Sequence, residues 1–106
     1  MNREDNAMVG FTIVAYAGDA KTFLLKALDR AKNGEYEDAE KLLKQADESI
    51  KEAHQEQTKV LANEAGGSDD QISFIMIHGQ DTLMTTMMLR DMAKYFIDLY
   101  KKVNKA

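Results

Sequence analysis

Residues 75–86, IMIHGQDTLMTT, place apolar side chains on nearly every side of a predicted helix, yet they include a histidine and an aspartate. Between Gln71 and Leu89 the only formal charge is Asp81. A helix that is apolar all round is buried all round or lies in a membrane. A membrane span is not favoured, because polar residues interrupt the stretch and a charged amphipathic segment follows it. The stretch therefore predicts a helix that needs partners on several sides.

Two short breaks divide the chain into three segments. Residues 33–34 (NG) are typical of a helix end, since glycine takes the left-handed conformation without penalty. The second break is residues 66–70 (GGSDD), where Ser68 and Gln71 have the spacing of a capping box and the two aspartates suit the positive end of a helix dipole. The sequence predicts helices over about 3–33, 35–65 and 69–103.

The first two predicted helices carry stripes of mostly apolar residues at alternating spacings of four and three. The stripes are Ile13, Ala17, Ala20, Leu24, Ala27 and Ala31, and then Ala39, Leu43, Ala46, Ile50, Ala53, Gln57 and Val60. Such stripes pack side by side, and short connections make neighbouring helices antiparallel. We therefore predict one all-α domain over residues 1–106, an up-down-up bundle of three helices, each about 45 Å long.

Composition excludes several classes of function. The net charge of −4 has the wrong sign for general nucleic-acid binding. The sequence contains no cysteine, no glycine-rich phosphate loop and no HExxH motif. The N-terminal residues are mixed and acidic, without the apolar run of a signal peptide. These features predict a soluble, cytoplasmic protein.

The third predicted helix is too apolar for one small chain to cover. Two partner helices cannot enclose it on every side, so the remaining face must meet another copy of the chain or a different protein. We predict an oligomer whose interface is made mainly by this helix. The alternative is a methionine-rich surface that binds varied partners.

Asp81 belongs to a mixed face of the third helix, which comprises Phe74, His78, Asp81, Thr85, Met88 and Met92. If three copies of this helix met around an axis, three Asp81 carboxylates would converge. They could not all stay ionised without a cation or bound protons, and oxygen ligands favour a hard cation such as magnesium. The alternative is that Asp81 pairs with a lysine, an arginine or water.

His78 stands at the head of a dense polar set, which is Gly79, Gln80, Asp81, Thr82, Thr85 and Thr86. Glycine inside a helix costs about 1 kcal/mol relative to alanine, so Gly79 suggests a close approach to the backbone there. An imidazole can act as base, ligand or nucleophile. No serine or cysteine partner for acyl transfer is apparent, so a phosphoryl acceptor fits better. The alternative is a hydrogen-bonded core histidine.

Several of these segments resemble one known family. HGQD at 78–81 and LMTT at 83–86 resemble the signature of the lactose/cellobiose-type enzyme IIA of the bacterial phosphoenolpyruvate-dependent sugar phosphotransferase system. IVAYAGDA at 13–20, EAHQEQT at 52–58, the NREDN start and the DLYKK end are also similar to family segments. The resemblance covers essentially the whole chain.

The resemblance implies a homotrimer of three-helix subunits with the third helices around the axis. It implies that His78 receives a phosphoryl group from the histidine-containing phosphocarrier protein and passes it to a cysteine of the cognate IIB subunit. It also implies that Asp81 binds a metal at the trimer axis, for which the oxygen ligands favour magnesium, and that Gln80 helps to position the phosphoryl group. The sugar would be lactose or a related disaccharide, and the membrane would be reached only through the IIC permease.

One position departs from the family pattern, and a second histidine needs a separate interpretation. The family usually has a second histidine four residues after the first, where this chain has Thr82. Threonine at that spacing shares a helix face with His78 and can donate a hydrogen bond, but it cannot carry charge. We expect it at most to assist phosphoryl positioning. For His54, within the EAHQEQT segment, we expect a structural role.

Two other readings compete with the phosphocarrier. Residues 33–46, NGEYEDAEKLLKQA, with the helix before them, resemble the helical hairpin of tetratricopeptide scaffolds, where Gly34, Tyr36 and Ala39 would allow close packing. Stacked repeats need several such hairpins, and only one is present. A metal-binding stress protein would rest on His78 and Asp81 alone.

Overall fold

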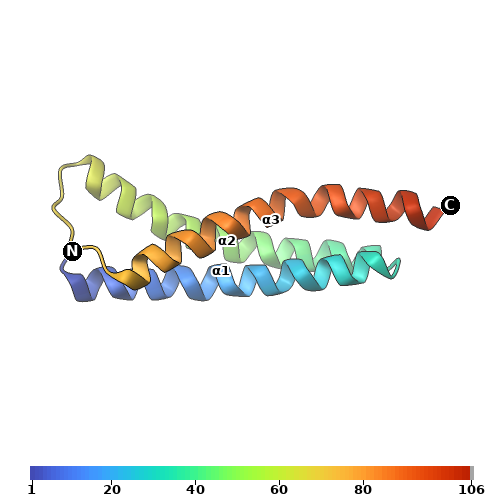
Figure 1. The fold of residues 1–106 in the computed structure, drawn as a ribbon, viewed down its shortest axis with the longest axis horizontal. Coiled ribbons are helices and arrows are strands. Elements are labelled where there is room, and N and C mark those ends of the chain that lie inside the picture. Colours follow the sequence, from blue (N-terminus) through green and yellow to red (C-terminus); the bar gives the residue numbers. More distant parts are fainter. Residues whose placement is uncertain (106) are drawn as a thin grey trace.

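The computed structural model describes residues 1–105, which form three long helices and no strand: α1 (Arg3–Lys32), α2 (Tyr36–Ala65) and α3 (Phe74–Lys105). The helices lie along a rod of 57 × 20 × 18 Å. α1 and α3 run in the same direction and α2 runs back between them in sequence (Figure 1). The predicted three-helix up-down-up bundle is therefore confirmed for the single chain.

Residues at both ends of α1 and in the first turn of α2 suit these positions. The Asn2 side chain caps α1 by accepting a hydrogen bond from the backbone N–H of Asp5 at 2.8 Å. Gly34 follows α1 with φ of +79°, a conformation that favours glycine. Glu37 and Asp38 lie in the first turn of α2, in the favourable sense of the helix dipole.

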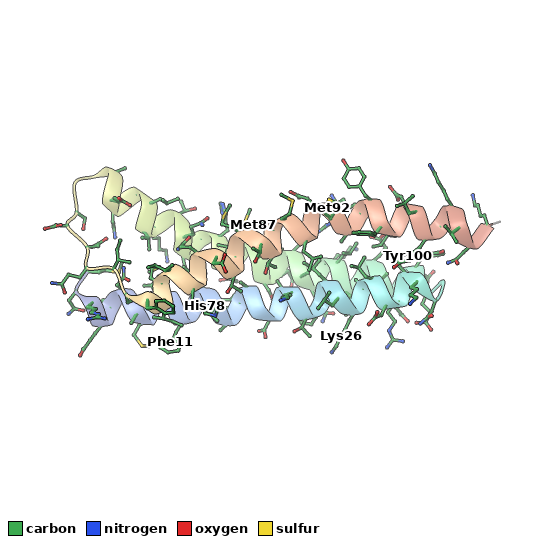
Figure 2. The ribbon with its side chains drawn as sticks, viewed as in Figure 1. Phe11, Lys26, His78, Met87, Met92 and Tyr100 are labelled. Carbon is green, nitrogen blue, oxygen red and sulfur yellow. The ribbon has the colours of Figure 1, made fainter. Side chains whose placement is uncertain are left out.

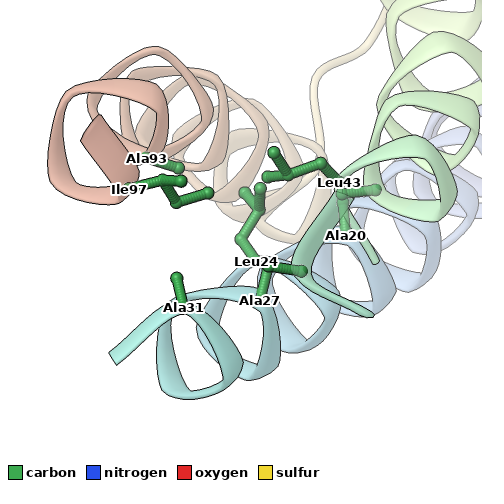
Figure 3. Packing of buried hydrophobic residues seen from close by; sticks show 9 residues of the cluster. Ala20, Leu24, Ala27, Ala31, Leu43, Ala93 and Ile97 are labelled. Atoms are coloured by element: carbon green, nitrogen blue, oxygen red, sulfur yellow. The ribbon is translucent and has the colours of Figure 1, made fainter. Parts of the chain in front are cut away.

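The predicted stripes form the core. All six residues predicted for α1 are fully buried, and in α2 only Ile50 and Val60 are less than buried. The buried residues form two clusters. The larger one, at the end of the bundle away from the N-terminus, is Ala20, Leu24, Ala27, Ala31, Ala39, Leu43, Ala46, Ala93 and Ile97 (Figure 3). The smaller one is Ile13, Ala17, Ala53, Met76 and Leu83.

α1 is the central partner, since it packs along both other helices, whereas α2 and α3 contact each other little. Two glycines let α1 and α3 approach closely. A Cβ atom on Gly10 would lie 2.7 Å from the Met76 backbone nitrogen, and one on Gly79 would lie 3.0 Å from the Gly10 carbonyl oxygen. The expectation that something approaches the backbone at Gly79 is confirmed, and the neighbour is α1.

The predicted start of α3 is wrong by five residues. Ser68 does not cap a helix; its Oγ donates to Asp70 at 2.8 Å. The helix begins at Phe74, and Ser73 caps it by accepting a hydrogen bond from the Met76 backbone N–H at 3.2 Å. Asp70 also accepts a hydrogen bond from the N-terminal ammonium at 2.6 Å, which lowers the pKa of its carboxyl. The two aspartates therefore precede the helix and do not serve its dipole.

By length and composition α1 could cross a membrane, and it is the one helix within residues 1–105 that could. The core helix of a soluble protein meets the same criteria. The buried stripe of α1 faces the other two helices, while 28% of its apolar window is buried within the described residues.

Candidate functional site

His78 lies in the second turn of α3, near the end of the bundle where that helix begins (Figure 2). Its side chain is exposed and makes no hydrogen bond with any of the described residues. The next residue, Gly79, is buried against α1. The imidazole therefore projects into solvent from a turn of helix whose backbone is held firmly on its other side.

The face predicted around His78 is exposed along its whole length. Phe74, Asp81, Thr85, Met88 and Met92 are all exposed with it, Phe74 at 80% and Met88 at 63%. Other large apolar side chains of α3 are also exposed, namely Ile77, Met84, Tyr95, Phe96, Leu99 and Val103. The prediction that one chain leaves this helix partly uncovered is confirmed.

Asp81 lies one turn beyond His78 on this face. Its carboxylate is exposed and forms no ion pair or hydrogen bond within residues 1–105. The described part of the chain contains no cluster of three histidine, cysteine, aspartate or glutamate side chains that could hold a metal. A metal at Asp81 would therefore need ligands from more than one chain, or water.

The threonines near His78 use their hydroxyl protons on the backbone. Thr82 Oγ1 donates to the His78 carbonyl at 2.8 Å, and Thr85 Oγ1 donates to the Asp81 carbonyl at 2.8 Å. Such bonds to the preceding turn are common for threonine in helices. Thr82 can donate to a phosphoryl oxygen only after giving up its bond to the His78 carbonyl, and its oxygen can only accept until then.

Gln80 is turned away from the exposed face, as expected for a residue two positions from His78. It is half-buried, and its Oε1 accepts a hydrogen bond of 2.6 Å from Gln57 Nε2 of α2. Its own Nε2 donates to the sulfur of Met76 at 3.4 Å. The sequence placed Gln57 on the buried stripe of α2, but its polar partner could not be identified without the packing of α2 on α3.

His54 is exposed on α2, and its backbone carbonyl accepts a hydrogen bond from Thr58 Oγ1 at 2.9 Å. The imidazole is not packed in the core of the chain. The expected structural role of His54 stays a prediction.

Comparison with known proteins identifies the class. The family model described as "PTS system, Lactose/Cellobiose specific IIA subunit" matches residues 8–101. The chain is 53% identical over 102 residues to the "PTS system lactose-specific EIIA component" of Streptococcus mutans, covering 96% of this chain and 98% of that protein. The protein of the same description from Staphylococcus epidermidis is 54% identical with the same coverage.

Solved structures agree. The PTS cellobiose-specific enzyme IIA from Bacillus anthracis has a TM-score of 0.89 and 38% identity, covering 92% of this chain and 90% of that one. The structure described as the IIA(Chitobiose)–HPr complex of the Escherichia coli phosphotransferase system has a TM-score of 0.78 and 30% identity, covering 92% and 94%.

The protein is thus a IIA component of the bacterial sugar phosphotransferase system, a subunit that carries out phosphoryl transfer together with partner proteins. Within that class, the chain belongs to the lactose/cellobiose-specific IIA family. The tetratricopeptide-like scaffold is not favoured, because the match extends through all three helices.

Proposed function

We propose that His78 accepts the phosphoryl group from the histidine-containing phosphocarrier protein, HPr, and passes it to a cysteine of the cognate IIB subunit. In the first step a nitrogen of His78 attacks phosphorus and the N–P bond on the phosphocarrier breaks. In the second step the cysteine sulfur attacks phosphorus and the N–P bond at His78 breaks. The exposed, unpaired imidazole within the HGQD match supports this role, and one structural relative is a complex with HPr.

The surroundings of His78 suit a carrier that depends on its partners. An exposed imidazole lets a protein donor come within bonding distance, and the rigid turn beneath it limits the positions it takes. A phosphoryl group brings close to two negative charges, yet residues 71–89 contain no lysine or arginine. Any cationic group that contacts the phosphoryl group therefore comes from outside this stretch, and we expect the docked partner protein to supply it.

The experiment is a phosphorylation assay with phosphoenolpyruvate and the general phosphotransferase enzymes. We expect an acid-labile phosphate on His78 and none on the His78→Ala variant. His54→Ala is the matched control, since His54 is also an exposed helical histidine, and it should be labelled normally. Labelling of His78→Ala, or loss of labelling in His54→Ala alone, would contradict the assignment.

We also propose that the chain assembles as a homotrimer through α3, with Asp81 from each copy near the axis. The exposed apolar face of α3 supplies the contact area. The Asp81 carboxylate fits a shared cation because it is exposed and lacks a partner among residues 1–105. A bound divalent cation, magnesium by the preference of oxygen ligands, would neutralise the converging carboxylates.

Light scattering tests this assembly. We expect three times the chain mass of 12.0 kDa at micromolar concentration. Asp81→Leu should keep the trimer, because it removes the converging charges, and should abolish binding of the divalent cation. A stable single chain would overturn the trimer, and unchanged cation binding in Asp81→Leu would overturn the metal site.

We assign the protein to uptake of lactose or a related disaccharide, acting in the cytoplasm and meeting the membrane only through the IIC permease. The lactose-specific relatives named above are 53–54% identical to the chain, whereas the cellobiose and chitobiose structures are 30–38% identical. Two strains separate the sugars, one lacking its own lactose IIA component and one lacking its own cellobiose IIA component, each complemented with this chain and grown on the corresponding sugar. Growth on cellobiose alone would contradict lactose.

The phosphorylation assay also tests whether Thr82 and Gln80 help to position the phosphoryl group. Thr82→His places the family's usual second imidazole next to His78, and we expect phosphorylation of His78 to change in rate but to persist. Gln80→Ala should slow it only modestly, because Gln80 faces α2. If Thr82→His has no effect on the rate, the residue at this position plays no part in phosphoryl positioning.

A further inference from the structure

Asn6 is a buried amide at the end of the stripe that α1 otherwise fills with apolar residues and glycine. The residue is 1% exposed, and an amide buried without hydrogen bonds destabilises the fold. The Oδ1 atom accepts two hydrogen bonds, from the Ser73 backbone N–H at 2.8 Å and from Ser73 Oγ at 3.0 Å. All the hydrogen bonds found for the Asn6 side chain within residues 1–105 thus go to one residue, 67 positions away.

Ser73 is the residue that caps α3. It is 5% exposed, the one buried residue in the connector between α2 and α3. Its Oγ accepts from the Met76 backbone N–H at 3.2 Å while its own proton goes to Asn6. The Asn6 oxygen therefore orients the serine hydroxyl so that a lone pair faces the helix. Through these two hydrogen bonds, α1 determines the residue at which α3 begins.

The contact between α1 and the first turns of α3 extends from Ser73 towards His78. Gly10 lies against the backbone of Ile75 and Met76, and Gly79 lies against Gly10. His78 is the fifth residue of α3, so the turn that carries it rests directly on the turn that Ser73 caps. An uncapped first turn frays, because its backbone N–H groups lose their partner. The connector before it is exposed almost throughout, and the hydrogen bonds that tie it to the start of the chain at Asp70 and Gln71 go to Met1, not to the first turn of α3.

We propose that Asn6 is a positioning residue for phosphoryl transfer, acting through Ser73 on the turn that bears His78. This inference rests on the proposed function of His78. Asn6 touches neither the imidazole nor the phosphoryl group. It narrows the range of positions that the imidazole samples, so that more encounters with the phosphorylated donor have the attacking nitrogen in line with phosphorus.

The test compares three variants of the full chain. Asn6→Ala removes the accepting oxygen, Asn6→Asp retains one, and Ile97→Val removes a methyl group from the far end of α3, the helix that carries His78. Asn6→Ala leaves the buried N–H and hydroxyl of Ser73 without their acceptor, and Ile97→Val leaves a small cavity. Both changes lower the stability of the fold, so Ile97→Val controls for a general loss of stability. The measurements are kcat and KM for the phosphorylated donor, and hydrogen exchange at the amides of residues 76–78.

For Asn6→Ala we expect kcat to fall by about threefold to tenfold, the range that a lost cap of this size allows, with KM changed less than twofold. Exchange at residues 76–78 should accelerate. Asn6→Asp should recover most of kcat, and Ile97→Val should leave kcat and this exchange unchanged. Should Asn6→Ala fail to fold, Ser73→Ala takes its place, with the same expected loss of kcat.

The outcomes separate the two proposals. Absence of label on the wild-type His78 would overturn the proposed function and this inference together. A labelled wild type with equal kcat in Asn6→Ala, or an equal loss in Ile97→Val, would overturn only the positioning role. Faster exchange at residues 76–78 without loss of kcat would also overturn it, because the cap would then be purely structural.

Discussion

The two ends of the bundle are stabilised in different ways. At the end far from the N-terminus, small and branched aliphatic side chains from all three helices fill the interior (Figure 3). At the end that carries His78 the apolar cluster is smaller, helices α1 and α3 meet through the backbone at Gly10 and Gly79, and buried or half-buried polar groups link the helices. Aliphatic packing tolerates exchange of similar volumes, whereas directed hydrogen bonds fix one arrangement. The comparison indicates that the far end supplies stability and the site end supplies geometry.

The largest expected effect comes from emptying the far end. Leu24 is fully buried in the larger cluster, and truncation of a buried leucine to alanine costs about 2–5 kcal/mol. We expect Leu24→Ala to lower the free energy of unfolding by that amount in urea titrations, while the labelling rate per folded molecule stays the same. Leu25→Ala is the matched control, because Leu25 is 47% exposed, and it should cost less than about 1 kcal/mol. A lower labelling rate per folded molecule in Leu24→Ala would contradict the separate roles of the two ends of the bundle.

Gly10→Ala should give the next largest effect, and it should lower both the stability of the fold and the labelling rate of His78. The new Cβ would lie 2.7–2.8 Å from backbone atoms of Ile75 and Met76, and backbone cannot move aside as a flexible side chain can. Overpacking of this kind costs about 1–3 kcal/mol, more than the roughly 1 kcal/mol that alanine gains over glycine in a helix. We expect a lower unfolding midpoint and slower labelling of His78. Unchanged labelling would show that the close approach does not set the position of α3.

The sequence predicted well what depends on periodicity within one helix. The buried stripes of α1 and α2 follow from spacings of three and four, and so does the exposed face that places His78 and Asp81 one turn apart. A residue's neighbours along its own helix are fixed by the helical repeat. Gly79 also gave a usable signal, because glycine inside a helix needs a reason.

The sequence failed where the partner lies on another helix. Ser68 has the spacing of a cap and Ser73 does not, yet Ser73 caps α3 because the Asn6 oxygen, 67 residues earlier, orients it. The spacing placed Gln57 in the buried stripe of α2, but it could not predict the hydrogen bond to Gln80, which depends on how α2 packs against α3. Neither partner can be found before the helices are placed side by side, since no local pattern records it.

Gln57→Leu tests the hydrogen bond between α2 and α3, and we expect a smaller loss of stability than for Gly10→Ala. The change removes the 2.6 Å hydrogen bond to Gln80 and leaves a half-buried oxygen without its donor. The cost should be about 1 kcal/mol, measured by urea unfolding. Gln55→Leu makes the same chemical change at an exposed position of α2 and should stay within about 0.5 kcal/mol of wild type. Equal effects of the two variants would show that the bond contributes nothing.

Gly18→Ala should have the smallest effect and the opposite sign. Gly18 lies in the same helix as Gly10, but within the described residues a Cβ atom there would meet no atom within 4 Å beyond its chain neighbours and the nearby backbone of α1. Alanine is favoured over glycine in a helix by up to about 1 kcal/mol, and no clash opposes this gain. We therefore expect a slightly higher unfolding midpoint and an unchanged labelling rate. Because Gly10→Ala makes the same chemical change two turns away, the difference between the two variants isolates the contact with α3. Destabilisation by Gly18→Ala would mean that this part of α1 is covered by another molecule, and the comparison would then have to be made on the assembly.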